Sequence, residues 1–171
     1  MVTAAAHRCG KQLVRELALD GYDVAVCSLA VLPSRVKMVE QLGHKAIALR
    51  LFTTHAGSAA WAIGEVHRAL GPIDALIHVD GDSIIPADGS PDATTTAALP
   101  DLVARKGLLM VLTERCSNRF MNEIPSITRI NLECDGKVPS GEICNSAMQL
   151  LRDRVGGRYV LERGKAARRV A

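Results

Sequence analysis

Apolar and polar positions repeat along the first half of the chain in a way that predicts helices separated by short apolar runs. In the opening stretch, Leu13, Val14 and Leu17 recur on one helical face, and Gly21 follows at the usual left-handed end of a helix. Two more helices are expected, from Pro33 to about Leu42 and from Gly57 to Leu70, because their apolar residues keep the same spacing.

A short apolar or β-branched run follows each of these helices. The runs are Asp23–Cys27, Ala46–Leu51 and Ala75–Val79. Helices that alternate with short buried strands are typical of a parallel sheet with right-handed crossovers. The first half therefore predicts a doubly wound, Rossmann-like α/β fold.

The pattern changes after the fourth strand. Residues 81–100 are rich in Gly, Pro, Asp, Ser and Thr and predict an irregular surface loop. A helix from Leu102 to Phe120 and a strand from about Thr128 to Leu132 are expected next, followed by a helix beginning at Ser140 and a last strand at Tyr159–Leu161. We expect one domain over residues 1–164 and a basic tail over residues 165–171.

Charge and cysteine content exclude several classes. The formal net charge of +3 over 171 residues is too small to predict nucleic-acid binding by itself. The five cysteines form no CxxC pair and the histidines have no ligand spacing, so no disulfide framework and no metal site are expected. Basic residues crowd the end of the chain, where they are either solvated or contact RNA, anionic lipid or an acidic partner: Arg163, Lys165, Arg168 and Arg169.

Location is predicted only broadly. No apolar run approaches the ~20 residues that span a bilayer, so no membrane helix is expected. Unpaired cysteines favour a reducing compartment, which makes the protein intracellular. Cytoplasm and mitochondrion both remain open, because the basic, acid-free start of the chain is similar to a transit peptide.

Several segments resemble the short-chain dehydrogenase/reductase superfamily, in the order in which that family has them. The opening VTAAAHRCG resembles the TGxxxGxG turn, and Arg8 at the second glycine resembles the TGAAxRxG turn of the pteridine reductase branch. ALGPIDALIHVDG resembles strand four with its NNAG ending. The stretch from Lys106 to residue 136 resembles the helix that starts at the catalytic lysine and the strand that ends in RVNAVxPG, and VPSGEICNSAMQLLRDRVGGRYVLERG resembles the closing helix and strand.

The resemblance implies candidate site residues. Thr3, Arg8, Gly10 and His78 would take the cofactor-binding positions, and Lys106 would be a vestigial catalytic lysine. The irregular loop stands where the family has a helix and the strand with the catalytic serine, so we expect a shortened fold that lacks both. Leu102 takes the place of the catalytic tyrosine and has no ionisable group.

The positions that would hold a dinucleotide are also altered. Ala4 replaces the first glycine of the turn, and Phe52 and Asp135 replace the family's aspartate near adenine and its PG proline. Three apolar residues fall where the family recognises the adenosine ribose: Leu29, Ala30 and Val31. The prediction is therefore that no cofactor binds, and that NADP is the cofactor if one does.

Two functions follow as hypotheses. The first is a catalytically inactive scaffold or structural subunit of a larger assembly, in which protein partners cover an exposed sheet edge and helix faces. RNA is a possible partner of the basic tail, and a homo-oligomer is also possible. The alternative is an NADPH-dependent oxidoreductase of pteridine reductase type. Its proton donor would come from a partner chain or from the loop acids Asp82, Asp88 and Asp92.

Overall fold

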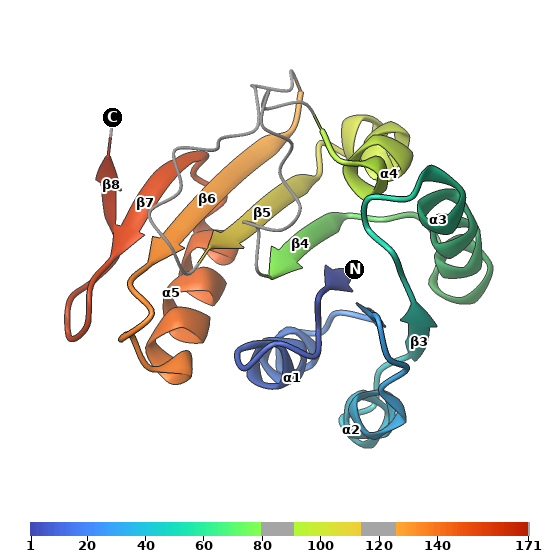
Figure 1. Cartoon of the computed structure of the whole chain (residues 1–171), viewed down its shortest axis with the longest axis horizontal. Coiled ribbons are helices and arrows are strands. Elements are labelled where there is room, and N and C mark those ends of the chain that lie inside the picture. The colour runs from blue at the N-terminus through green and yellow to red at the C-terminus, as the bar shows by residue number, and fades with distance from the viewer. Residues whose placement is uncertain (80–90, 114–125, 171) are drawn as a thin grey trace.

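The computed structural model describes residues 1–79, 91–113 and 126–170. Within them, all strands join one sheet in the order β3-β2-β1-β4-β5-β6-β7-β8, which is parallel except for β8 (Figure 1). The strands are β1 Val2–Thr3, β2 Val24–Ser28, β3 Ala46–Arg50, β4 Ala75–Val79, β5 Leu108–Thr113, β6 Thr128–Cys134, β7 Gly157–Leu161 and β8 Arg168–Val170. The helices are α1 Gly10–Leu19, α2 Pro33–Gln41, α3 Ala56–Leu70, α4 Ala93–Ala104 and α5 Ser140–Asp153.

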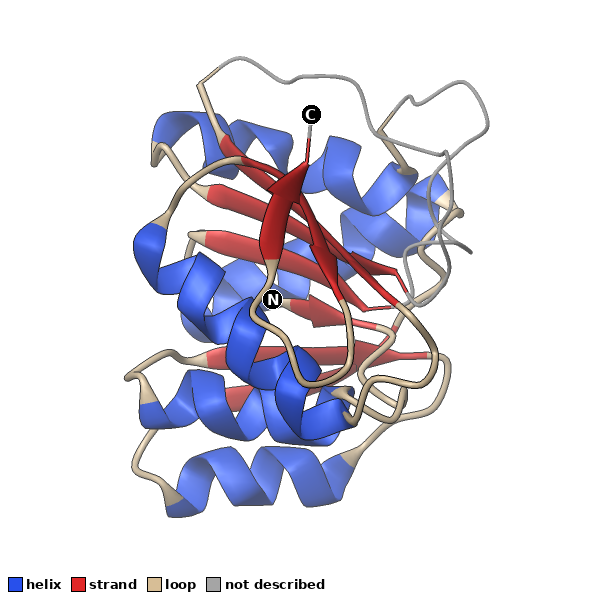
Figure 2. Ribbon diagram, turned by 90° about the vertical axis from the view of Figure 1, so that its left-hand side faces the viewer, coloured by secondary structure: helices blue, strands red, loops and turns tan. Residues whose placement is uncertain are grey.

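Helices cover both faces of this sheet, as Figure 2 shows. Helices α1, α2 and α5 bury one apolar cluster, to which α1 contributes the predicted Leu13, Val14 and Leu17. Helices α3 and α4 bury a second cluster on the other face. The predicted doubly wound α/β fold is confirmed. None of the described helices has the length and apolarity to cross a membrane.

The helix predicted over Leu102–Phe120 is wrong at residues 108–113, although residues 102–104 are the last turn of α4. Residues 108–113 form β5, which pairs with β4 through Ala75 and with β6 through Thr128. All six residues are buried between the two helix layers. A short run of apolar residues suits a buried strand as well as a helix, so periodicity could not decide between them. An inner strand is therefore present where the sequence predicted that one was missing.

The irregular loop predicted over residues 81–100 is also wrong in its described part. Helix α4 begins at Ala93, and the Asp92 side chain accepts backbone N–H groups from Thr94 at 2.8 Å and Thr95 at 3.2 Å. This capping stabilises the start of a helix that carries Pro100 in its second half. The predicted positions 81–90 and 114–120 lie outside the described residues.

Part of the expected basic tail belongs to the sheet. Residues 168–170 form β8, which pairs antiparallel with β7 and makes one edge of the sheet. Lys165 and Arg168 both pair with Glu162, so this end of the chain is neutralised in part by its own acid. Strand β3 makes the opposite edge.

Candidate functional site

The carboxyl ends of β1 and β4 meet in the middle of the sheet, where Thr3 pairs with His78. Open parallel sheets bind ligands at this edge, at the point where the strand order reverses. The structure brings four of the five predicted site residues to this place: Thr3 and His78 on the strands, and Arg8 and Gly10 in the turn that leads into α1.

His78 is the centre of a buried polar network. Its Nδ1 lies 2.8 Å from the Thr3 hydroxyl, and its Nε2 lies 2.9 Å from the Thr95 hydroxyl and 3.2 Å from an Asp92 carboxylate oxygen. All four residues are buried. Both ring nitrogens are therefore satisfied by the protein, and the imidazole joins β1, β4 and α4.

Asp92 is held as a carboxylate within this network. Burial by itself would raise its pKa, but the hydrogen bond and charge of His78, together with hydrogen bonds from Thr95, lower the pKa below its ordinary value. The Thr95 hydroxyl donates to Asp92 Oδ2 at 2.6 Å. Of the three loop acids considered as proton donors, Asp92 is thus buried and ionised, while Asp82 and Asp88 lie outside the described residues.

The turn from β1 to α1 keeps the backbone shape that glycine normally supplies. Ala4 has φ of 47°, in the left-handed region. A Cβ atom at Gly10 would lie 2.2 Å from the Ala5 carbonyl oxygen, so that position requires glycine. The turn therefore has a position at Gly10 that only glycine can occupy and carries a strained methyl group at Ala4.

The N–H groups of this turn mostly donate within the protein. Those of His7 and Gly10 donate to the carbonyls of Ala4 and His7, both at 2.9 Å, and that of Ala5 donates to Cys27 at 2.9 Å. These amides resemble a phosphate cradle in position, but each already has an acceptor.

Arg8 connects the turn to the segment between β6 and α5. Its Nη1 donates to the Val138 carbonyl at 2.9 Å and to the Ser140 hydroxyl at 3.2 Å. The guanidinium that the sequence suggested for a phosphate thus contacts the start of α5.

Cys9 is buried immediately before α1, beside Cys144. The thiol of Cys144 donates a hydrogen bond to it, and Ser140, Arg8 and His7 also favour the thiolate, so the pKa of Cys9 falls to about 6 although burial opposes this. The same pairing raises the pKa of Cys144, whose Sγ also donates to the Cys9 carbonyl at 3.4 Å.

Lys106 lies away from these residues. It follows α4 and precedes β5, beside Asp74 at the amino edge of the sheet, whereas Thr3 and His78 lie at the carboxyl edge. The Asp74 carbonyl accepts the Leu108 N–H at 3.0 Å, which fixes that position. This placement argues against a vestigial catalytic role for Lys106, which was predicted from a helix that the structure does not contain.

The residues at the expected adenosine position form an exposed apolar patch. Leu29 is 65% exposed and Val31 is 53% exposed after β2, and Phe52 is 45% exposed after β3. Arg50 stacks on the Phe52 ring, 5.2 Å from its centroid. The Leu51 N–H donates to the Ser28 carbonyl at 3.0 Å, so the two strand ends are adjacent.

Sequence reasoning missed Thr113 and Thr95. Thr113 ends β5, is buried, and its hydroxyl has no hydrogen-bond partner among the described residues. It borders a cavity of about 10 Å³ with His7, Val79 and Cys134, which at most matches one water. No group of three or more His, Cys, Asp or Glu residues in the described ranges is arranged to hold a metal ion.

Comparisons with known proteins show which solved structures have a similar fold. No protein-family model matches the chain. A hydroxysteroid dehydrogenase from Escherichia coli superposes with a TM-score of 0.72 at 16% identity, covering 95% of this chain and 93% of that chain. A metagenomic short-chain oxidoreductase in complex with NADP superposes with a TM-score of 0.73 at 14% identity, covering 96% of each. The chain has the short-chain dehydrogenase/reductase fold.

One curated protein is similar to this chain in sequence over part of its length. The L-2,3-butanediol dehydrogenase of Corynebacterium glutamicum is 32% identical over 85 residues, which is 47% of this chain and 33% of that protein. A 3-ketoacyl-ACP reductase from Sinorhizobium meliloti is similar in structure, with a TM-score of 0.73 at 14% identity. The superposition covers 95% of this chain and 97% of that chain.

The described residues fit a dinucleotide poorly. The methyl group of Ala4 stands where the short-chain dehydrogenase/reductase turn has a glycine, and the amides beside it already donate to the protein. The side chains after β2 offer no hydrogen bond to a ribose. We derive no step of a reaction through that cofactor.

Proposed function

We propose that this chain is a catalytically inactive protein with the short-chain dehydrogenase/reductase fold, which serves as a structural subunit of a larger assembly in the cytoplasm or mitochondrion. The observation that carries the proposal is His78, whose two ring nitrogens are both bound by buried protein groups. A side chain in this state holds strands together and has no capacity left for a ligand.

The turn before α1 supports the same function. Arg8 donates hydrogen bonds to the Val138 carbonyl and the Ser140 hydroxyl. A phosphate arriving there would meet amides that already donate to protein carbonyls. We therefore propose that the protein binds no cofactor, and that NADP is the candidate if one binds.

The surface for a protein partner is the apolar patch of Leu29, Val31 and Phe52. Three exposed apolar side chains at neighbouring strand ends, with Arg50 against the phenyl ring, have the composition of an interface centre. RNA is the second partner we consider, at the exposed basic side chains Arg163, Lys165, Arg168 and Arg169. The inner strand whose loss was expected to leave an exposed sheet edge is present as β5.

Dinucleotide binding tests the loss of the cofactor. We expect neither NADPH nor NADH to change the melting temperature of the chain at millimolar concentration. A ligand at about a hundred times its Kd would add about 2.7 kcal/mol of stability, so a saturating rise would overturn the proposal. Ala4→Gly is the matched variant, since it restores the family's residue at a left-handed position and should still show no response.

The assembly itself is tested on the natively purified protein. Leu29→Glu and Phe52→Glu should each release the chain from the larger complex in size-exclusion chromatography. Val155→Glu is the control, because Val155 is 47% exposed outside the patch. A native protein that elutes as a stable monomer, or patch variants that behave like the control, would reject the structural-subunit function.

A reductase is the second candidate, and one observation favours it. The Thr113 hydroxyl, which has no hydrogen-bond partner within the described ranges, lies at the carboxyl end of β5, where a carbonyl oxygen of a substrate could accept its hydrogen bond. The test compares oxidation of 2,3-butanediol with NAD⁺ and reduction of biopterin with NADPH. Activity that Thr113→Val removes and that the exposed-site control Thr96→Val retains would establish this alternative.

A further inference from the structure

Two cysteines that are far apart in the sequence meet where α1 begins. Cys9 immediately precedes α1, and Cys144 lies in the first half of α5. The Cys144 Sγ atom lies 3.4 Å from the Cys9 carbonyl oxygen, and the Cys144 thiol donates a hydrogen bond to the Cys9 sulfur. The packing of α1 against α5 thus brings together two thiols that are 135 residues apart.

The contact between these thiols is close to the geometry that a disulfide requires. Cys9 and Cys144 are both reduced, and both are buried in the core on the α1 and α5 side of the sheet. A disulfide bond holds its two sulfur atoms about 2.0 Å apart. Because the sulfur atoms already share a hydrogen bond, rotation about the side-chain bonds brings them toward this distance.

The surroundings of Cys9 favour its reactive form. Hydrogen bonds from Cys144 and Ser140 lower the pKa of Cys9 to about 6, and the charge of Arg8 acts in the same direction. The thiolate is the nucleophilic form of cysteine. Burial alone acts on Cys27 in the opposite sense and raises its pKa to about 12. Of these two buried cysteines, Cys9 is therefore the one that reacts with an oxidant.

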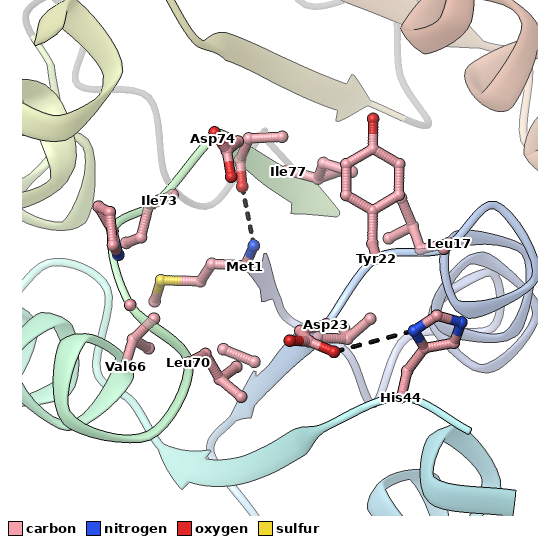
Figure 3. A pocket seen from close by; sticks show the side chains of 16 residues that line it. Met1, Leu17, Tyr22, Asp23, His44, Val66, Leu70, Ile73, Asp74 and Ile77 are labelled. Carbon is pink, nitrogen blue, oxygen red and sulfur yellow. Dashed lines mark hydrogen bonds and ion pairs between the residues drawn. The ribbon is translucent and has the colours of Figure 1, made fainter. Parts of the chain in front are cut away.

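Cys9 borders a cavity of about 10 Å³ at the carboxyl edge of the sheet, which Cys134 also lines. A space of that size holds about one water molecule, so the oxidant that suits it is one close to water in size, such as hydrogen peroxide. The larger cavity, of about 430 Å³, lies at the amino edge of the sheet beside Met1 and Asp74 (Figure 3). It therefore offers no route to Cys9.

We propose that Cys9 and Cys144 form an oxidation site, at which hydrogen peroxide produces a disulfide between the β1–α1 turn and α5. The Cys9 sulfur attacks one peroxide oxygen and the O–O bond breaks. Cys9 becomes a sulfenic acid, and the leaving hydroxide takes up the Cys9 thiol proton as water. The Cys144 sulfur then attacks the Cys9 sulfur, the S–O bond breaks, and the hydroxide leaves with the Cys144 proton as a second water. This site does not depend on the function proposed above.

Peptide mapping of the intact chain tests the pairing. The reduced, folded chain is exposed to hydrogen peroxide, alkylated in denaturant and digested with trypsin without reduction. Each of the five cysteines lies in a different tryptic peptide, so mass spectrometry identifies any pair. We expect peptide 9–11 to be linked to peptide 138–152, at a mass two hydrogens below their sum. Cys27 is the internal control, because it is as buried as Cys144 and should stay fully alkylated.

Variants separate the two steps of the reaction. In Cys144→Ser the reaction should stop at the Cys9 sulfenic acid, which dimedone labels, whereas Cys27→Ser and Cys134→Ser should form the same disulfide as the parent chain. The oxidised parent chain should melt at least about 5 °C above the reduced one, because the disulfide constrains a long segment of the unfolded chain. Cys144→Ser should show no such rise after oxidation.

Three results would overturn the proposal. The first is a peroxide-treated chain in which all five cysteines remain alkylated. The second is a disulfide that joins Cys9 to Cys134 or Cys116 in place of Cys144. The third is an equal yield of the Cys9–Cys144 disulfide from the chain unfolded in urea, since the folded structure would then have no part in the pairing. Each of these readouts uses the parent chain, so none depends on the folding of a variant.

Discussion

The Nδ1 atom of His78 and the hydroxyl of Thr3 lie 2.8 Å apart, and this contact ties β4 to β1 where both side chains are fully buried. The other ring nitrogen binds Thr95 and Asp92 at the start of α4. A buried network is stable while every member is present, and the loss of one leaves the others unpaired in a region of low dielectric.

His78→Ala should therefore destabilise the protein strongly. Removal of one partner from a buried charged network costs about 3–5 kcal/mol, because the Asp92 carboxylate stays buried without its partner. Urea unfolding measures the difference. His67→Ala is the control: His67 pairs with Asp101 at 2.6 Å but is 45% exposed, so its removal should cost less than about 1 kcal/mol.

His78→Asn tests how far hydrogen bonding alone accounts for the stability of the network. Asparagine can donate and accept hydrogen bonds, so it should recover part of the stability that alanine loses. If alanine and asparagine both left the unfolding free energy within about 0.5 kcal/mol of the parent chain, the network would have no structural role.

Asp92 should make the folded state sensitive to acid. Burial opposes its ionisation, but His78 and Thr95 lower its pKa below the ordinary value of 3.8. The folded chain therefore binds this proton less tightly than the unfolded chain does. The stabilisation is complete when the pH is above the pKa of Asp92 in the unfolded chain, and it is lost as the pH falls through the lower pKa of Asp92 in the folded chain. Urea unfolding of the parent chain and of Asp92→Asn at a series of pH values checks this, and identical acid slopes would contradict it.

The parts of the fold that could be predicted are those with strong local signals. The helix that became α1 has its apolar stripe on Leu13, Val14 and Leu17 and a glycine after it, and the structure buries that stripe. The strand β5 and helix α4 lack such signals. Leu108–Thr113 is apolar throughout, and the Ala93–Ala104 segment contains three threonines and Pro100, so packing between the sheet and α3 decides both.

The residues of the candidate site could be predicted from the sequence only where they lie close together along the chain. Thr3, Arg8 and Gly10 are adjacent in sequence, so a motif places them together. His78 contacts Asp92 and Thr95 only because α4 lies over β4, and no pattern in the sequence around His78 predicts that contact. Lys106 was misplaced because its position depended on a helix that is a strand in the folded chain.

Ala4→Gly should stabilise the protein slightly. Ala4 has φ of 47°, where a Cβ atom is unfavourable, so glycine relieves about 1 kcal/mol of strain or more. Glycine also increases the conformational entropy of the unfolded chain, which lowers the stability by a somewhat smaller amount. Thermal unfolding measures the net gain. Gly21→Ala is the reciprocal control: φ is 90° there and nothing lies within 4 Å of an added Cβ, so backbone conformation alone should make it destabilising. A loss of stability in Ala4→Gly would show that the methyl group packs favourably.

The buried amino group of Met1 should make stability rise with pH between about 6 and 8. Burial lowers its pKa from 8.0 to about 6, although Cys27 and Asp74 favour the charged form. In that window the unfolded chain carries the proton and the folded chain does not, so stability falls as pH decreases and levels off below the folded value. Two pKa units correspond to about 2–3 kcal/mol.

Acetylation of Met1 isolates this contribution. Urea unfolding of both chains across the window should show a pH-dependent difference that the acetylated chain lacks. Acetylation leaves every other ionisable group of the chain in place, so the effects of those groups cancel in the comparison. Equal pH dependence of the two chains would mean that the amino group keeps its ordinary pKa.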